Sequence, residues 1–195
     1  MSIRRILIRA LECGEYLLTR LFVGLKIPED IREELLSLCS GLENVRWVKK
    51  ENFHITLQFI GEVQKSYLDD LVQSLSEIRF SQFDLTLNGI NFFNSTRLIR
   101  SIWIGIREKE NLIRLHSKIN ISIEKAGISF KRRKFMPHVS IARFTRQPVS
   151  RFQDYIEGNA LFSSRSFTIE NFTLFESVLK PDGPIYLTNT TFPSR

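Results

Sequence analysis

Two short segments of the chain each carry a histidine that is followed two residues later by a hydroxyl side chain. They are His54 with Thr56 and His138 with Ser140, and the whole protein has only three histidines. A neutral imidazole can accept a proton while a second, protonated imidazole donates one near neutral pH. Two hydroxyls can hold the non-bridging oxygens of a phosphoryl group while charge develops on them. These side chains fit hydrolysis of a cyclic phosphate on ribose, with no metal required.

Both segments have the pattern of a half-buried β-strand. Within residues 53–59, one face would carry Ile55, Leu57 and Phe59, and the other face His54, Thr56 and Gln58. Residues i and i+2 of a strand point to the same face, which places each histidine beside its hydroxyl. Residues 137–143 repeat the pattern a little under half the chain later. This repetition indicates an internal pseudo-repeat, with two lobes that face each other across a cleft.

Other chemistries fit these residues less well. Zinc usually takes three or four protein ligands, and the third histidine, His116, lies on a separate predicted helix, where its spacing indicates a packed structural side chain. A serine or threonine nucleophile needs a base aimed at it, whereas i and i+2 neighbours on a strand lie alongside each other. The chain has no GxSxG motif and no glycine-rich nucleotide-binding loop. We therefore expect neither a metal nor a cofactor.

The elements that must position the two strands are a mixture of helices and hairpin-linked strands. A helix is expected after Pro28, a second from a capping box at Ser66 and Asp69, and a third over residues 108–126 with Gly127 as its stop. This order predicts an α+β fold that is bilobal, with two largely antiparallel sheets facing across a central cleft and helices on the outside. We divide the chain into an N-terminal extension, residues 1–19, and a single bilobal domain, residues 20–195.

Composition narrows the class of protein and its partners. A chain of 195 residues with 43% hydrophobic content can bury a core, and a net charge of +7 suits an anionic partner such as nucleic acid. The two cysteines, Cys13 and Cys39, form no disulfide framework, which favours a reducing, cytoplasmic setting. No apolar run approaches the roughly 18 residues of a membrane span, so we expect no membrane partner.

Further substrate contacts are expected near the second motif. Lys134 ends a basic run, residues 131–134, just before His138, where it could clamp an RNA backbone. Arg143 lies five residues after His138, and strict alternation puts it on the opposite face of the strand. A substrate contact by Arg143 would therefore need a bulge or the end of the strand. Aromatic side chains can stack on a base, and the candidates are Phe22, Phe59 and Phe135.

The two motifs, His54-Ile55-Thr56-Leu57 and His138-Val139-Ser140-Ile141, resemble those of the 2H phosphoesterase superfamily. Within it, the chain is similar to the RNA 2′,3′-cyclic phosphodiesterases, also called bacterial 2′-5′ RNA ligases. The likeness covers about residues 20–192. It rests on residues 20–25 with 28–32, residues 52–63, residues 137–143 and residues 172–177.

The resemblance implies a role for each motif residue. His54 would be the proton donor to the leaving oxygen and His138 the proton acceptor that activates water. Thr56 and Ser140 match the hydroxyl positions, and Ser140 replaces the usual threonine while keeping the donor. An arginine commonly follows the second motif, which Arg143 matches. The implied reaction is metal-independent hydrolysis of an RNA 2′,3′-cyclic phosphate to a 2′-phosphate, with reversible joining of 2′-5′ linkages in tRNA halves.

Two alternatives stay open beside this reading. The first is a phosphodiesterase for a small cyclic nucleotide or a 2′-5′ oligonucleotide. The second is a basic RNA-binding module without turnover, which the matched acid and base argue against. In each case we expect the protein to act as a monomer.

Overall fold

The computed structural model describes residues 18–195 except 96–97, 147–150 and 182. The predicted extension, residues 1–19, lies outside the described residues apart from Leu18 and Thr19, which begin the first strand. The strands are β1 (Leu18–Lys26), β2 (Val45–Trp47), β3 (His54–Gln64), β4 (Phe83–Ser95), β5 (Leu98–Ile106), β6 (Val139–Phe144), β7 (Ser163–Ile169), β8 (Asn171–Lys180) and β9 (Gly183–Pro193). The helices are α2 (Glu29–Leu36), α3 (Leu68–Ser76), α4 (Glu110–Lys125) and α5 (Phe152–Gly158), with 3₁₀ turns η1 (Lys50–Asn52) and η2 (Lys65–Tyr67).

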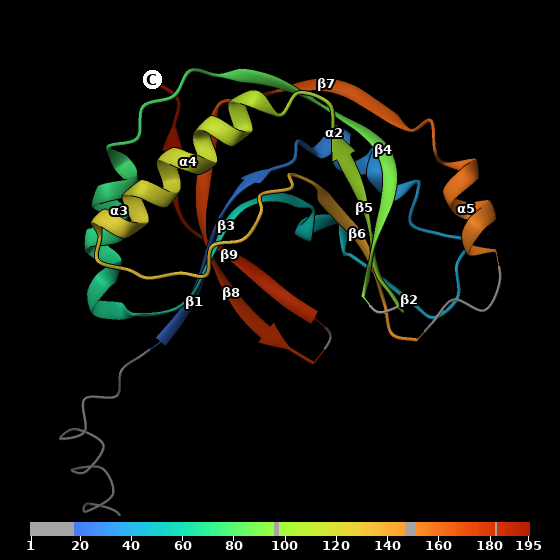
Figure 1. Ribbon diagram of the computed structural model, residues 1–195, viewed down its shortest axis with the longest axis horizontal. Coiled ribbons are helices and arrows are strands. Elements are labelled where there is room, and N and C mark those ends of the chain that lie inside the picture. Colours follow the sequence, from blue (N-terminus) through green and yellow to red (C-terminus); the bar gives the residue numbers. More distant parts are fainter. Residues whose placement is uncertain (1–17, 96–97, 147–150, 182) are drawn as a thin grey trace, which may run out of the picture.

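All described strand pairs are antiparallel, and they form a single curled sheet of nine strands (Figure 1). The order along the sheet is β7-β4-β5-β6-β3-β1-β8-β9, and β2 pairs with β6. The two halves of the sheet meet where β3 pairs with β6, at Ile55 opposite Val139. The predicted α+β, largely antiparallel fold is confirmed, and the two expected sheets are the two halves of this one sheet. The strands that carry the two motifs therefore lie side by side at its centre.

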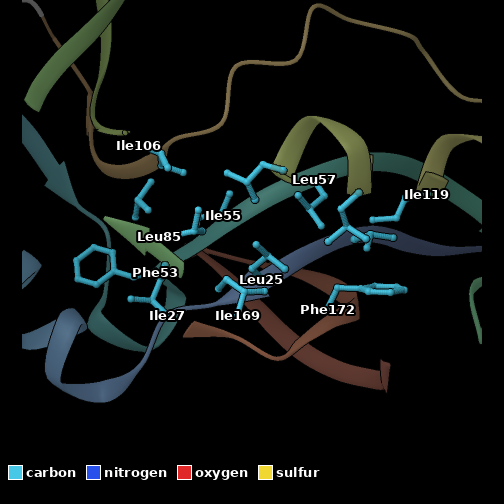
Figure 2. Close-up of a cluster of buried hydrophobic side chains, with 14 of the residues drawn as sticks. Leu25, Ile27, Phe53, Ile55, Leu57, Leu85, Ile106, Ile119, Ile169 and Phe172 are labelled. Atoms are coloured by element: carbon cyan, nitrogen blue, oxygen red, sulfur yellow. The ribbon is translucent and has the colours of Figure 1, made fainter. Parts of the chain in front are cut away.

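Helices α3 and α4 lie next to each other and cover one side of the sheet (Figure 1). The centre of each apolar stripe is fully buried, with Leu71 and Leu75 from α3 and Leu112, Leu115, Ile119 and Ile123 from α4. Figure 2 shows Ile119 of α4 close to Leu57 of β3, within the cluster that also holds Leu25 and Ile55. Each fully buried Leu or Ile contributes about 1.5–3 kcal/mol relative to an exposed one. The face of β3 opposite the histidine is thus held firmly against the core.

The helix boundaries follow the sequence closely, with one exception. Pro28 precedes the first residue of α2, and Gly127 has a φ of +73° just after α4, as a helix stop requires. The predicted capping box at Ser66 is wrong. Ser66 lies inside the 3₁₀ turn η2, so Tyr67 precedes α3 and no side chain caps that helix. No helix among the described residues is long and apolar enough to cross a membrane.

Matching β-bulges interrupt β3 and β6 at the third residue after each histidine. In β3, Thr56 pairs with Gly24 and Gln58 pairs with Val23, so Leu57 has no partner of its own. In β6, Ser140 pairs with Trp103 and Ala142 pairs with Ile102, so Ile141 is the extra residue. A bulge reverses the alternation of faces beyond it. The expected pseudo-repeat therefore extends to the irregularities of the two strands.

The bulges change which residues share a face with the histidines. Phe59 was expected on the apolar face with Leu57, but it is 58% exposed, while Gln58 is buried in its place. Arg143 is likewise exposed, while Ala142 before it is fully buried. Because of the bulge, Arg143 points to the same side of the sheet as His138. This is the condition under which the sequence analysis expected Arg143 to contact the substrate.

Candidate active site

Both histidines line one cavity of about 690 Å³. Thr56 and Ser140 line it beside them, and so does Arg143. The cavity follows from the central pairing of β3 with β6, because the exposed faces of both strands open on the same side. The remaining described lining residues are Arg46, Trp47, Val48, Lys49, Asn52, Phe59, Phe93, Arg100, Ser101, Pro181, Gly183, Pro184 and Tyr186.

The orientation of His54 is fixed by hydrogen bonds at both ring nitrogens. Nδ1 lies 2.7 Å from the carbonyl oxygen of Asn52, which can only accept, so Nδ1 carries the hydrogen in the neutral ring. The hydroxyl of Thr56 then donates to the lone pair of Nε2 at 3.0 Å. Asn52 is itself anchored, because its side-chain amide donates to the carbonyl of Pro184 at 3.0 Å. The Nε2 lone pair of His54 thus points toward the hydroxyl of Thr56.

His138 is held in the same way at its first nitrogen. Its Nδ1 donates to the carbonyl oxygen of Met136 at 2.6 Å, two residues earlier, as His54 does to Asn52. The Nε2 atom makes no hydrogen bond within the described part of the chain. Both rings therefore share one tautomer, with Nε2 able to accept a proton.

Aromatic side chains from other strands of the sheet pack against both imidazole rings. The ring of His54 lies 5.0 Å from that of Phe22 and 4.9 Å from that of Tyr186, between centroids. The ring of His138 lies 5.1 Å from Phe93 and 5.5 Å from Trp103. Such packing restricts rotation of both imidazoles, so that Nε2 stays in one place relative to the adjacent hydroxyl.

Burial makes both histidines reluctant to take a proton. It lowers the pKa of His54 from 6.5 to about 4, and the positive charges of His138 and Arg143 act in the same direction. Burial also lowers the pKa of His138. A positive charge on one ring therefore disfavours a positive charge on the other, and the lowered pKa values favour the neutral form of both rings at pH 7.

The cavity is strongly basic. Four cationic side chains, Arg46, Lys49, Arg100 and Arg143, line it, and no aspartate or glutamate does so among the described residues. Arg46 and Arg143 lie directly opposite each other across the β2–β6 pair. Like charges in that arrangement repel each other, which an anion bound between them would relieve.

Two of the predicted substrate contacts lie outside the cavity. Phe22 is only 1% exposed and is enclosed by His54, Phe59, Phe175 and Tyr186, so the expected stacking of Phe22 on a base is corrected here. Lys134 is exposed in the loop before β6 and does not line the cavity.

The other two aromatic candidates, Phe59 and Phe135, lie in different places. Phe59 does line the cavity, on the side of His54. Phe135 instead stacks flat on His116, with ring centroids 4.1 Å apart. His116 is half-buried there and receives a hydrogen bond from the Asn120 amide at 3.2 Å, as expected for a packed side chain.

Several lining residues were missed by the sequence analysis, notably Arg46, Arg100 and Tyr186. Each reaches the cavity through a strand pairing or a hairpin that joins distant parts of the chain, so no local pattern marks it. Among the described residues, no three His, Cys, Asp or Glu side chains come together in a group suited to a metal ion.

Comparison with known proteins identifies the family. The chain matches the family described as LigT-like phosphoesterase over residues 25–103 and again over residues 104–186. It is 34% identical to the RNA 2′,3′-cyclic phosphodiesterase of Archaeoglobus fulgidus, over 86% of this chain and 96% of that protein. It is 28% identical to the protein of the same name from Thermotoga maritima, over 86% of this chain and 91% of that protein.

A solved structure supports the fold. The crystal structure of E. coli LigT complexed with 3′-AMP superposes with a TM-score of 0.75 at 24% identity, and the match covers 91% of this chain and 98% of that one. The two matched segments divide the chain into halves that each contain one His motif. The resemblance noted in the sequence is confirmed: the chain belongs to the LigT-like phosphoesterase family.

Proposed function

We propose that this protein hydrolyses the 2′,3′-cyclic phosphate at the end of an RNA, leaving a 2′-phosphate, by acid–base catalysis with two histidines and no metal. The observation that carries the proposal is the pair of histidine–hydroxyl sets, His54 with Thr56 and His138 with Ser140, on the walls of one basic cavity. The names of the relatives in Archaeoglobus and Thermotoga support the choice of substrate.

The proposed step is an in-line displacement at phosphorus. The Nε2 lone pair of His138 takes a proton from a water molecule, whose oxygen forms the new bond to phosphorus. The bond from phosphorus to the ribose 3′ oxygen breaks, and that oxygen receives the proton carried on Nε2 of His54. The hydroxyls of Thr56 and Ser140 donate to the non-bridging oxygens, and the Arg143 guanidinium offsets their growing charge. One water is consumed, and each positioned histidine contributes about 10²–10⁴-fold.

The electrostatics of the cavity indicate that substrate binding promotes protonation of His54, the proposed acid. Burial and the nearby positive charges hold the pKa of His54 at about 4, so few molecules carry the proton at pH 7. A bound phosphodiester anion close to His54 favours the imidazolium and raises that pKa. The proton donor is thus formed when the substrate binds. His138, which accepts a proton, is already neutral in the free protein.

Phe59 supplies a place for the base of the terminal nucleotide. Its ring is 58% exposed, lines the cavity and rests on the buried ring of Phe22 at 5.7 Å. An exposed aromatic face stacks on any base, with about 1–3 kcal/mol per stacked base. This contact would orient the nucleotide without selecting its sequence.

The test is incubation of the purified protein with an RNA oligomer that ends in a 2′,3′-cyclic phosphate, in the presence of EDTA. We expect complete ring opening, with a 2′-phosphate as the product identified by ³¹P NMR. A 3′-phosphate product would contradict the assigned leaving group, and loss of activity in EDTA that added metal restores would contradict the metal-free step. Parallel reactions with a mononucleotide 2′,3′-cyclic phosphate and a 2′-5′-linked dinucleotide separate the alternative substrates.

The same groups can carry out this displacement with a different nucleophile. A 5′-hydroxyl in place of water would attack the cyclic phosphate and join two RNA ends through a 2′-5′ linkage, for instance in tRNA halves. Because both histidines come from one chain, we propose that a monomer is sufficient for either reaction. Incubating cyclic-phosphate and 5′-hydroxyl tRNA halves at high concentration, with gel analysis, tests this; absence of joined product under conditions of rapid hydrolysis would exclude it.

A further inference from the structure

We propose that Arg46 and Arg100 form a second phosphate subsite, which binds the internal phosphodiester just upstream of the terminal cyclic nucleotide and so selects an RNA strand over a mononucleotide. This inference rests on the proposed function, which supplies the terminal nucleotide at the two histidines. It concerns residues to which the proposed ring-opening step assigns no role.

The first argument is the geometry of three adjacent strands. Across the sheet, Arg46 of β2 lies opposite Arg143 of β6, and Arg143 lies opposite Ser101 of β5. Directly opposed residues of an antiparallel sheet share a face. All three therefore point to the same side, and all three line the cavity. Figure 1 shows β2, β5 and β6 close together, on the side of the molecule away from α3.

Arg100 joins this row through an irregularity in β5. Ser101 pairs with Phe93 and Ile99 pairs with Asn94, so Arg100 is an extra residue between two strand pairs. It is exposed and lines the cavity, although a regular strand would turn residue 100 away from the side of residue 101. The bulge thus adds a second arginine beside the Arg46–Arg143 pair.

The second argument is the absence of balancing charge. Within the described chain, Arg46 and Arg100 form no ion pair with a carboxylate, and the described cavity lining has none. The smaller cavity of about 310 Å³ on the other side of His54 differs in this respect. There, Glu51 is part of the lining and Arg32 is already paired with Glu29. Among the described residues, the larger cavity is lined by four cationic side chains and no carboxylate, whereas the smaller one is lined by Lys26, the already paired Arg32 and Glu51, which favours the β2–β5 side for the strand.

The third argument is distance along the strand. Ser140, which faces the scissile phosphate in the proposed step, and Arg143 are separated by the bulge and by about two residues of extended chain, roughly 7 Å at 3.3 Å per residue. A separation of this order is comparable to one nucleotide step of an extended strand. Arg46 and Arg100 lie on the strands on either side of Arg143, so they are placed to meet the next phosphate, while the Arg143 side chain extends toward the terminal phosphate between the histidines.

The test compares two substrates in the same variants. One is cytidine 2′,3′-cyclic phosphate, and the other is a short RNA that ends in the same nucleotide. In Arg46→Gln and Arg100→Gln, we expect kcat/KM for the RNA to fall about tenfold, the effect of losing one charge-assisted hydrogen bond, and to fall at least fivefold more than for the mononucleotide. Arg114→Gln, which removes an exposed arginine of α4 that lines neither cavity, is the matched control for net charge.

Equal losses on both substrates would overturn the proposal, because the arginines would then act at the terminal nucleotide. No loss in either variant, with a loss in Lys134→Gln, would also overturn it and would place the strand on the loop before β6. A measurement of RNA binding tests this inference separately from the proposed hydrolysis. In fluorescence anisotropy with a 3′-phosphorylated RNA, we measure the slope of the logarithm of the binding constant against the logarithm of the salt concentration. This slope should become less steep by about 0.7 for each arginine removed, even in a protein that hydrolyses neither substrate. An unchanged slope in both arginine variants would contradict the subsite directly.

Discussion

Phe59 and Arg143 occupy the same position in the two halves of the sheet. Each lies five residues after its histidine, two residues after a bulge, and opposite a residue of the neighbouring strand, Phe22 for Phe59 and Ser101 for Arg143. Both line the central cavity as a result. One half therefore contributes an aromatic face and the other a guanidinium. The pseudo-symmetric cavity is made asymmetric at this pair, which suits a substrate with a base at one end and a phosphate at the other.

The first prediction concerns Arg143. Changing Arg143→Gln should lower kcat/KM for a cyclic nucleotide by about 10²-fold, as removal of one donor to a developing oxyanion does. Arg143→Lys should recover only part of the loss, because the ammonium group cannot make the two parallel hydrogen bonds of a guanidinium. Steady-state kinetics with the mononucleotide measures both. Activity of Arg143→Gln within threefold of the wild type would show that Arg143 does not contact the reacting phosphate.

The second prediction is that phosphate raises the pKa of His54. In the free protein, burial and the nearby positive charges of His138 and Arg143 hold that pKa at about 4. Saturating inorganic phosphate adds negative charge to the cavity and should move the midpoint upward, which NMR of the imidazole Cε1–H signals reports. His116, outside the cavity, provides the internal control, and its midpoint should not move. If the titration midpoint of His54 is the same with and without phosphate, a bound anion does not raise its pKa, and the proposed protonation of His54 on substrate binding is excluded.

The sequence carried enough information to locate the catalytic strands but not their irregularities. Alternation correctly placed His54 beside Thr56 and His138 beside Ser140, because the segment from each histidine to its hydroxyl precedes the bulge. Nothing in the residue types around Leu57 or Ile141 marks an extra residue. Phe59 was therefore assigned to the wrong face, and Arg143 could be reconciled with the substrate only by postulating a bulge.

Local sequence patterns could not predict how residues of distant strands would be arranged around the site. Phe22 was expected to touch substrate, yet Phe175 of β8 and Tyr186 of β9 pack on it, more than 150 residues along the chain. Arg46 and Arg100 enter the cavity because β2 and β5 both pair with β6. Lys134 precedes His138 closely in sequence, but the loop carries it away from the cavity lining. Closeness in sequence to a motif was thus a poor guide to closeness in space.

The third prediction tests the structural role of Phe22. Because its ring is buried against His54, Phe22→Leu should lower kcat through a less restrained imidazole and leave KM nearly unchanged. The substitution should also cost about 1–2 kcal/mol of unfolding free energy, since part of the side-chain volume is kept. Kinetics and denaturant unfolding measure the two effects. A rise in KM with unchanged kcat would instead indicate that Phe22 contacts the substrate.

The fourth prediction links His54 to acid stability. In the unfolded chain this histidine takes up a proton below pH 6.5, whereas in the folded protein it does so only near pH 4. The unfolded state therefore binds more protons in this window, and stability is lost as the pH falls from about 6.5 to 4. The loss attributable to His54 is at most about 3 kcal/mol.

A comparison with His54→Gln isolates this contribution. Urea unfolding at several pH values should show a shallower decline in the variant than in the wild type, whatever the packing cost of the substitution at neutral pH. The carboxylates contribute equally to both proteins and cancel in the difference. Parallel curves for the two proteins between pH 6.5 and 4 would mean that the pKa of His54 is not lowered on folding.

The central claim is that two histidines of one cavity are the acid and the base. The most direct measurement is the rate of cyclic-phosphate opening by the wild type and by three single variants, His54→Ala, His138→Ala and His116→Ala, each confirmed as folded by circular dichroism. The account predicts losses of at least about 10²–10⁴-fold in the first two, the contribution of one positioned acid or base, and a rate within threefold of the wild type for the third. Retention of more than a tenth of the activity in either His54→Ala or His138→Ala would contradict it.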